Sequence, residues 1–354
     1  MRCTSSNRTS RKNLSTATRQ AVCETMESRR MFAATATLAG GVLTITGTNN
    51  PDVISISRSG TKLNVWLDVT LKQFTYSNVN KIKADLKSGN DRLTATNDVN
   101  KPMEVQGRAG NDTITGGANN DKLYGGDNND SLTGGWGNDS LYGGNGYDTH
   151  RGGLGNDSCY GGNQLDYFYD EAGRDRYFGD NDNDIMFADP TNITEADQFW
   201  GGSGFDYIFY SGRSQSVRIA TDDVANDGYT DGSHGAGIEL DNVHSDIEYL
   251  SGTEYADGIY AYGDHDNVIQ GGGGADYIMG GPGDDTVYGG DGNDWIFGDA
   301  GYDEMYGGNG NDNIYSNTDY WSEKVDGGAG FDTAVCGSHY GLPIDSLTSI
   351  ESWS

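Results

Sequence analysis

Apolar residues recur at every ninth position through much of this chain. In the first stretch they are Ile114, Leu123, Leu132 and Leu141, and in a later one Ile278, Val287, Ile296, Met305 and Ile314. Each lies in the middle of a three-residue run such as Ser140-Leu141-Tyr142, and in a strand the middle residue points to one face and its neighbours to the other. The pattern therefore predicts a series of short strands, each with one inward apolar side chain.

The six residues before each strand predict a turn. They follow the pattern Gly-Gly-x-Gly-x-Asp, which is clearest at 134–142 and 152–160. The paired glycines and the glycine at position four reach φ > 0 at little cost, and asparagine, frequent at position five, is the next most tolerant residue. Two nine-residue units then close one 18-residue coil, and stacked coils place Asp121 beside Asp139 about 4.8 Å apart.

The units form two blocks with outlying copies. Units run unbroken over 107–187 and continue over 192–209; further units cover 252–269 and, after a single inserted Gln270, 271–315, with outlying copies at 86–94 and 327–335. We predict that the aspartate of each unit is a metal ligand. These residues are Asp91, Asp112, Asp121, Asp130, Asp139, Asp148, Asp157, Asp166, Asp175, Asp184, Asp197, Asp206, Asp257, Asp266, Asp276, Asp285, Asp294, Asp303, Asp312 and Asp332.

The composition supports a metal-dependent fold. Only 34% of the residues are hydrophobic, and 53 acidic against 23 basic residues give a net charge of -30. So little apolar surface does not offset the entropy cost of ordering the chain, and the charge repels nucleic acid and anionic lipid. Ca²⁺ takes six to eight oxygen ligands from carboxylates and carbonyls, which these turns offer. No apolar run approaches the ~18 residues of a membrane span.

These units resemble the hemolysin-type, or repeats-in-toxin (RTX), calcium-binding nonapeptide. The resemblance implies an all-β, right-handed parallel β-roll with several Ca²⁺ ions between stacked turns, and secretion to the cell exterior or surface. The units of Asp166, Asp175 and Asp184 depart from the glycine pattern, for example by Gln164 at position four. Weak, distorted or empty sites are expected there.

The sequence also predicts the roles of the segments before, between and after the two blocks. Residues 1–33 form a basic leader in which Glu27-Ser28-Arg29-Arg30 resembles the sorting motif of exported bacterial surface proteins; the alternative is a plain disordered arm. Residues 34–106 predict a cap of metal-free rungs, with a separate carbohydrate-binding sandwich as the alternative. The calcium-binding blocks are predicted at 107–209 and 252–335, and a closing strand at 336–354. Residues 210–251 between the blocks predict insert rungs, whose acidic residues are either solvated or hold an extra cation.

No catalytic constellation is present in the sequence. The five histidines occur without a His-Glu-x-x-His motif, and the regular spacing of the acidic residues assigns them to calcium rather than to acid–base catalysis. His150 and Cys159 both take inward positions, but two ligands without a third do not make a site, so both are expected to be core substitutions.

The expected function is a calcium-dependent extracellular structural or surface-adhesion module that is not an enzyme. Two alternatives stay open: a platform for polysaccharide on the aromatic column Tyr124, Tyr142, Tyr160 and Phe178, and a solenoid enzyme acting on acidic polysaccharide. The candidate partners are calcium ions, cell-surface polysaccharide and further copies of the chain.

Overall fold

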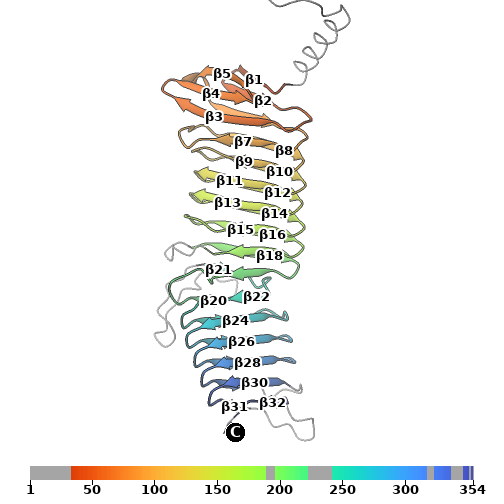
Figure 1. Ribbon diagram of the computed structural model, residues 1–354, viewed down its shortest axis with the longest axis vertical. Coiled ribbons are helices and arrows are strands. Elements are labelled where there is room, and N and C mark those ends of the chain that lie inside the picture. The colour runs from red at the N-terminus through yellow and green to blue at the C-terminus, as the bar shows by residue number, and fades with distance from the viewer. Residues whose placement is uncertain are drawn as a thin grey trace, which may run out of the picture.

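The computed structural model describes residues 33–188, 196–221, 241–316, 323–335, 346–350 and 352–353. In these residues the chain is a long stack of parallel strands, and its only helical element is the short 3₁₀ turn η1 (Tyr76–Asn78). The stack forms a rod that runs from the N-terminal strands to the C-terminal ones (Figure 1). The predicted all-β parallel roll is confirmed.

Three sheets make the walls of the rod, and neighbouring strands within each sheet are hydrogen-bonded to one another. The first sheet contains, in spatial order, β1 (Thr35–Ala39), β2 (Val42–Thr46), β6 (Lys81–Asp85), β8 (Met103–Ala109), β10 (Lys122–Asp127), β12 (Ser140–Asn145), β14 (Ser158–Asn163), β16 (Arg176–Asn181), β18 (Gln198–Ser203) and β21 (Asn242–Val243). The second, in order from its C-terminal end, contains β32 (Ser346–Thr348), β30 (Lys324–Ala329), β28 (Glu304–Asn309), β26 (Thr286–Asp291), β24 (Val268–Gly273), β22 (Tyr249–Ser251), β19 (Tyr207–Phe209), β17 (Ile185–Phe187), β15 (Tyr167–Tyr169), β13 (Thr149–Leu154), β11 (Ser131–Trp136), β9 (Thr113–Thr115), β7 (Arg92–Ala95), β3 (Val53–Ser59), β4 (Lys62–Leu67) and β5 (Thr70–Thr75). The third contains β20 (Arg218–Ala220), β23 (Gly258–Tyr260), β25 (Tyr277–Met279), β27 (Trp295–Phe297), β29 (Asn313–Tyr315), β31 (Thr333–Val335) and β33 (Ser352–Trp353).

The strand register confirms the predicted 18-residue coil. Leu123 pairs with Leu141 across β10 and β12, and Leu132 pairs with His150 across β11 and β13. Within the repeat blocks the inward residue of each strand is buried between the two walls, as Leu141 is, with no exposed surface. The core is therefore a double column with one inward side chain per strand, which leaves much of the stability to the turns.

The N-terminal end is closed by antiparallel strands. β1 pairs with β2, and β3, β4 and β5 form an antiparallel meander, whereas β2 and β3 also pair in parallel with β6 and β7 of the roll. The cap is thus continuous with both walls, which does not fit a separate sandwich. It covers the edges that the first parallel coil would otherwise expose.

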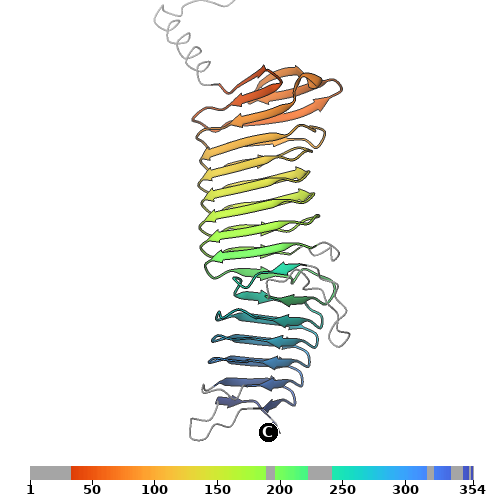
Figure 2. The same cartoon turned by 180° about the vertical axis from the view of Figure 1, so that it is seen from behind.

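The insert changes one wall of the rod. The first sheet ends at β21 and the third begins at β20, while the second sheet runs past the junction without a break (Figure 2). β20 precedes β21 in sequence but pairs with β23 of the later block. The insert therefore contributes rungs to both halves and joins them into one rod.

The register of one unit differs from the prediction. Val268 pairs with Thr286 and Ile269 with Val287, so Ile269 is the inward residue. The extra residue lies between the inward residues Ile259 and Ile269, and it is not Gln270. Asn267 then takes the buried position that was assigned to Asp266, which is exposed. The reason is packing, because the larger Ile269 side chain continues the column formed by Leu250 and Val287.

Some expectations fall outside the described residues. These are the leader over 1–32, the acidic residues of the insert at 222–240, and most of the closing segment at 336–345.

Candidate metal centres

Buried aspartates form columns along the edges of the rod. Every predicted ligand except Asp266 is buried. Their hydrogen bonds follow one rule: Oδ1 accepts a backbone N–H from the residue at the same position one coil earlier, at 2.7–3.0 Å, as Asp130 Oδ1 does from Asp112. The column on the second sheet contains Asp91, Asp112, Asp130, Asp148, Asp166, Asp184, Asp206, Asp285 and Asp303; that on the first contains Asp121, Asp139, Asp157, Asp175 and Asp197; that on the third contains Asp257, Asp276, Asp294, Asp312 and Asp332.

The second oxygen of these carboxylates points into a cradle of oxygen atoms. In most of them Oδ2 is buried and accepts no hydrogen bond from the residues that the structure describes, as in Asp112, Asp130 and Asp139. A Cβ placed on Gly134 would overlap both Asp139 Oδ2 and the carbonyl oxygen of Gly152 one coil further on, so these atoms face the same small space. The donors are a carboxylate and a carbonyl, which fit a hard cation such as Ca²⁺. The residues present therefore fit the expected ion.

The glycine positions have two distinct roles. Positions two and four take positive φ, as in Gly135 (φ 110°) and Gly137 (φ 125°), which confirms the expectation for them. The first glycine of each pair does not; it is required because any side chain would fill the cradle. Position five does not take positive φ either. Its asparagines form a ladder in which Asn138 N–H donates to Asn120 Oδ1 at 3.0 Å.

The units of Asp166 and Asp184, which depart from the glycine pattern, keep the same geometry but with backbone strain. Gln164, Asp180 and Asp182 take positive φ of 71–74° where the better units have glycine. Each such residue costs roughly 1–2 kcal/mol. Asp166 and Asp184 nevertheless have the same Oδ1 hydrogen bond and the same unpartnered Oδ2 as the well-matched units.

Burial makes the charged form of these carboxyls unfavourable. Desolvation, with smaller contributions from neighbouring aspartates, raises the pKa of Asp130 to about 8 and of Asp166 to about 9. The same causes raise the pKa of Asp276 to about 8. Ionised carboxylates stacked in this way need compensating positive charge.

The columns include residues that the nonapeptide pattern missed. Asp52 donates its N–H to Asp91 Oδ1, while Asp241, Glu248 and Glu323 accept the N–H groups of Asp197, Asp206 and Asp303. The glycine turn is lost or altered around each of these residues. A shorter sequence pattern could have indicated such a residue. It is an acidic residue, an inward apolar residue two positions later and a glycine two positions after that, as in Glu248-Tyr249-Leu250-Ser251-Gly252.

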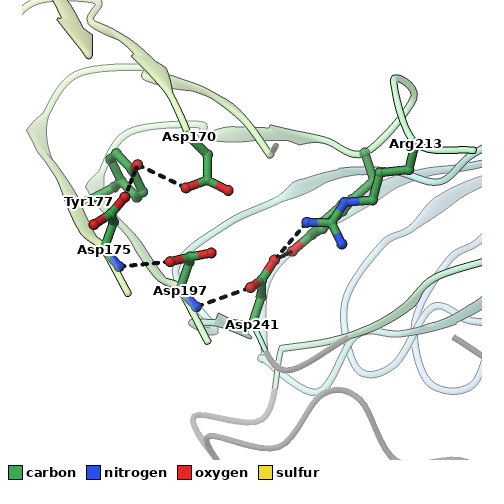
Figure 3. Close-up of polar contacts among 7 residues, drawn as sticks. Asp170, Asp175, Tyr177, Asp197, Arg213 and Asp241 are labelled. Carbon is green, nitrogen blue, oxygen red and sulfur yellow. Dashed lines mark hydrogen bonds and ion pairs between the residues drawn. The ribbon is translucent and has the colours of Figure 1, made fainter. Parts of the chain in front are cut away.

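One end of the first block contains an unusual acidic cluster (Figure 3). Ligand atoms of Asp170, Asp175 and Asp197 lie within 4.8 Å of one another, and the Tyr177 hydroxyl lies 2.9 Å from Asp170 Oδ1 and 3.2 Å from Asp175 Oδ2. Asp170 replaces the first glycine of its unit and adds a carboxylate that the nonapeptide pattern does not assign. Burial and the charges of Asp170 and Asp241 raise the pKa of Asp197.

An ion pair closes the cluster on the side of the insert. Arg213 Nη2 lies 3.2 Å from Asp241 Oδ2, with both side chains about 1% exposed. Asp241 Oδ1 in turn accepts the N–H of Asp197 at 3.0 Å, so the insert is joined directly to the first-sheet column.

The aromatic column on the first sheet is a closed stack. Tyr124, Tyr142, Tyr160 and Phe178 lie with ring centroids 4.7–4.9 Å apart and planes within 7°, and Trp200 continues the stack. The ring faces cover one another, so they are not open to a sugar ring. The geometric basis for a flat polysaccharide platform on this column is therefore missing, and the stack instead pairs side chains across the parallel strands.

Comparison with known families agrees with the columns. A model of the RTX calcium-binding nonapeptide repeat (4 copies) matches residues 104–132, 119–149, 151–186, 262–296 and 288–319. No curated protein matches the chain. Among the described residues no helix is long and apolar enough to cross a membrane. The matched parts of the two blocks are therefore RTX calcium-binding nonapeptide repeats, which makes the chain a calcium-binding repeat protein with a parallel β-roll fold.

Proposed function

We propose that this protein is a structural or surface-adhesion module of the cell exterior that folds only when it binds Ca²⁺ and has no catalytic role of its own. The observation that carries the proposal is the row of buried carboxylates whose Oδ2 atoms accept no hydrogen bond within the described part of the chain, such as those of Asp112, Asp130 and Asp148. A buried, unpartnered polar atom costs about 1–3 kcal/mol, and more when charged. The roll is thus unfavourable without a cation.

Calcium supply supports the extracellular part of the proposal. Repeat sites of extracellular modules half-saturate at about 10⁻⁴–10⁻³ M, a concentration found outside cells. A chain of this kind stays unfolded where calcium is scarce and folds where it is abundant, because ion binding then stabilises only the folded state. The continuous second sheet makes the folded state a rod, which suits a spacer or a surface coat.

The folding part is tested on the full chain by a calcium titration followed by circular dichroism, size-exclusion chromatography and ion counting. We expect little β signal and an expanded chain in excess chelator, and a cooperative gain of both with millimolar Ca²⁺. Full β signal and compactness in chelator would contradict the proposal.

The location and adhesion parts need the native host. Antibody labelling of intact cells should detect the protein at the surface, and calcium removal should release it or abolish attachment. Protein confined to the cell interior, or attachment unchanged by deletion of the gene, overturns this part. Turnover of an acidic polysaccharide by the calcium-loaded chain would instead favour the enzyme alternative.

A further inference from the structure

At one level of the second-sheet column, that is, between two stacked turns, a histidine side chain lies beside the carboxylates. His150 is the inward residue of β13, Asp148 lies just before that strand, and Asp166 lies just before the next strand, β15. One ligand atom from each of the three lies within 4.8 Å of the others. All three side chains are buried. Along the sequence only Cys159 suggested itself as a second ligand beside His150, whereas the structure places two carboxylates there.

The imidazole of His150 has no partner in the part of the chain that the structure describes. Neither Nδ1 nor Nε2 makes a hydrogen bond, and the ring has no exposed surface; Oδ2 of Asp148 and of Asp166 are equally unpartnered. Packing alone does not require an imidazole, because the register partner on the preceding strand is Leu132. Phe168 stacks on the ring with centroids 4.9 Å apart and planes 16° apart, which fixes its orientation.

The donor set differs from that of the neighbouring levels. Ca²⁺ selects oxygen, and the levels on either side offer an apolar Leu132 or Phe168 at the inward position. A neutral imidazole with two carboxylates suits a first-row transition ion, above all Zn²⁺, which accepts nitrogen and carboxylate ligands and tolerates three protein ligands. A divalent ion would also neutralise the two buried carboxylates.

We propose that Asp148, His150 and Asp166 form a site for a divalent transition-metal ion, with Zn²⁺ preferred over Ca²⁺ at this one level of the roll. Zn²⁺ bonds to nitrogen and oxygen are about 2.0–2.2 Å, so ligand atoms of a tetrahedral site are about 3.4 Å apart. Ligand atoms that lie within 4.8 Å of one another therefore come closer by at most about 1.4 Å when the ion binds. The ion replaces Ca²⁺ between these two turns and leaves the other levels to calcium.

The test compares the full-length protein with its His150→Leu variant, both folded in millimolar Ca²⁺. Leucine is the residue that pairs with this position one coil earlier, so the variant keeps the core. After incubation with Zn²⁺ and desalting into calcium buffer, the original protein should retain about one Zn²⁺ per chain and the variant at least tenfold less. Cys159→Leu is the matched control, since Cys159 is inward on the opposite wall and outside the cluster; it should retain zinc.

A second readout identifies the ligand. Co²⁺ bound in place of Zn²⁺ should give visible absorption bands that are lost in His150→Leu and kept in Cys159→Leu. Equal metal retention by the original protein and His150→Leu overturns the site. The circular dichroism response to Ca²⁺, measured on the same samples, is independent of this outcome, so failure of the zinc site and failure of calcium-dependent folding are distinguishable.

Discussion

The backbone N–H of Asp121 donates a 2.7 Å hydrogen bond to Oδ1 of Asp139, which lies one coil further along the rod. One oxygen of each carboxylate thus fixes the spacing between coils, and the other is left for a cation. Coil stacking and ion binding therefore depend on the same side chain.

Acidification should stabilise the metal-free roll. An aspartyl carboxyl has a pKa near 3.9 in an unfolded chain, but burial raises the pKa of Asp130 to about 8 and of Asp166 to about 9 in the fold. The folded state therefore holds protons that the unfolded state loses between about pH 4 and 8, and its stability falls as pH rises through that window. In chelator, the β signal should increase from pH 8 to pH 5.

Two controls accompany the pH experiment. An Asp130→Asn, Asp166→Asn double variant should show a smaller change with pH. Because Ca²⁺ displaces these protons, the apparent calcium affinity of the original chain should be weaker at pH 6 than at pH 8. A metal-free β signal that rises with pH contradicts the assignment.

Position within the array should decide the effect of losing a ligand. Asp139 Oδ2 is unpartnered, whereas Asp175 Oδ2 lies 3.2 Å from the Tyr177 hydroxyl and near a further carboxylate, Asp170. Asp139→Ala should therefore reduce calcium affinity and cooperativity more than Asp175→Ala, since coupling in a solenoid passes between neighbouring coils. Isothermal titration calorimetry compares the two, and superimposable curves would disprove the ranking.

A methyl group in the cradle should act like the loss of a ligand. Alanine at Gly134 places its Cβ against Asp139 Oδ2 and the Gly152 carbonyl oxygen. We expect Gly134→Ala to raise the calcium concentration needed for folding at least several-fold. Gly60→Ala is the control: Gly60, unlike Gly134, has positive φ (58°), but it has nothing within 4 Å of an added Cβ, so the change should cost only about 1 kcal/mol of backbone strain and leave the calcium midpoint nearly unchanged. Equal midpoints for both variants argue against the cradle.

The aromatic stack should contribute stability rather than a binding surface. Replacing Tyr124, Tyr142 and Tyr160 together by threonine removes three stacked pairs along the first sheet. At about 0.2–1 kcal/mol per cross-strand pair, the calcium-loaded roll should lose about 0.6–3 kcal/mol of unfolding free energy. Denaturant unfolding measures this loss, and glycan-array binding that disappears in the triple variant while stability persists would restore the platform hypothesis.

Much of the calcium-binding architecture was predictable from the sequence because each nonapeptide encodes its own turn and strand. Glycines at positions two and four allow the turn, the aspartate follows, and the inward residue comes two positions later, so Asp139 and Leu141 could be placed without a structure. These are local relationships, and an uninterrupted period of nine carries them from coil to coil.

Only the tertiary structure decided what happens where the period breaks. Asn267 rather than Asp266 enters its column because Ile269 continues the inward stack, and Glu248 joins from the insert because its strand pairs with β19 and β24. The meeting of His150 with Asp166 likewise depends on the stacking of β13 on β15. Residues that are distant in sequence are brought together by packing between coils, and a pattern read along one unit does not contain that information.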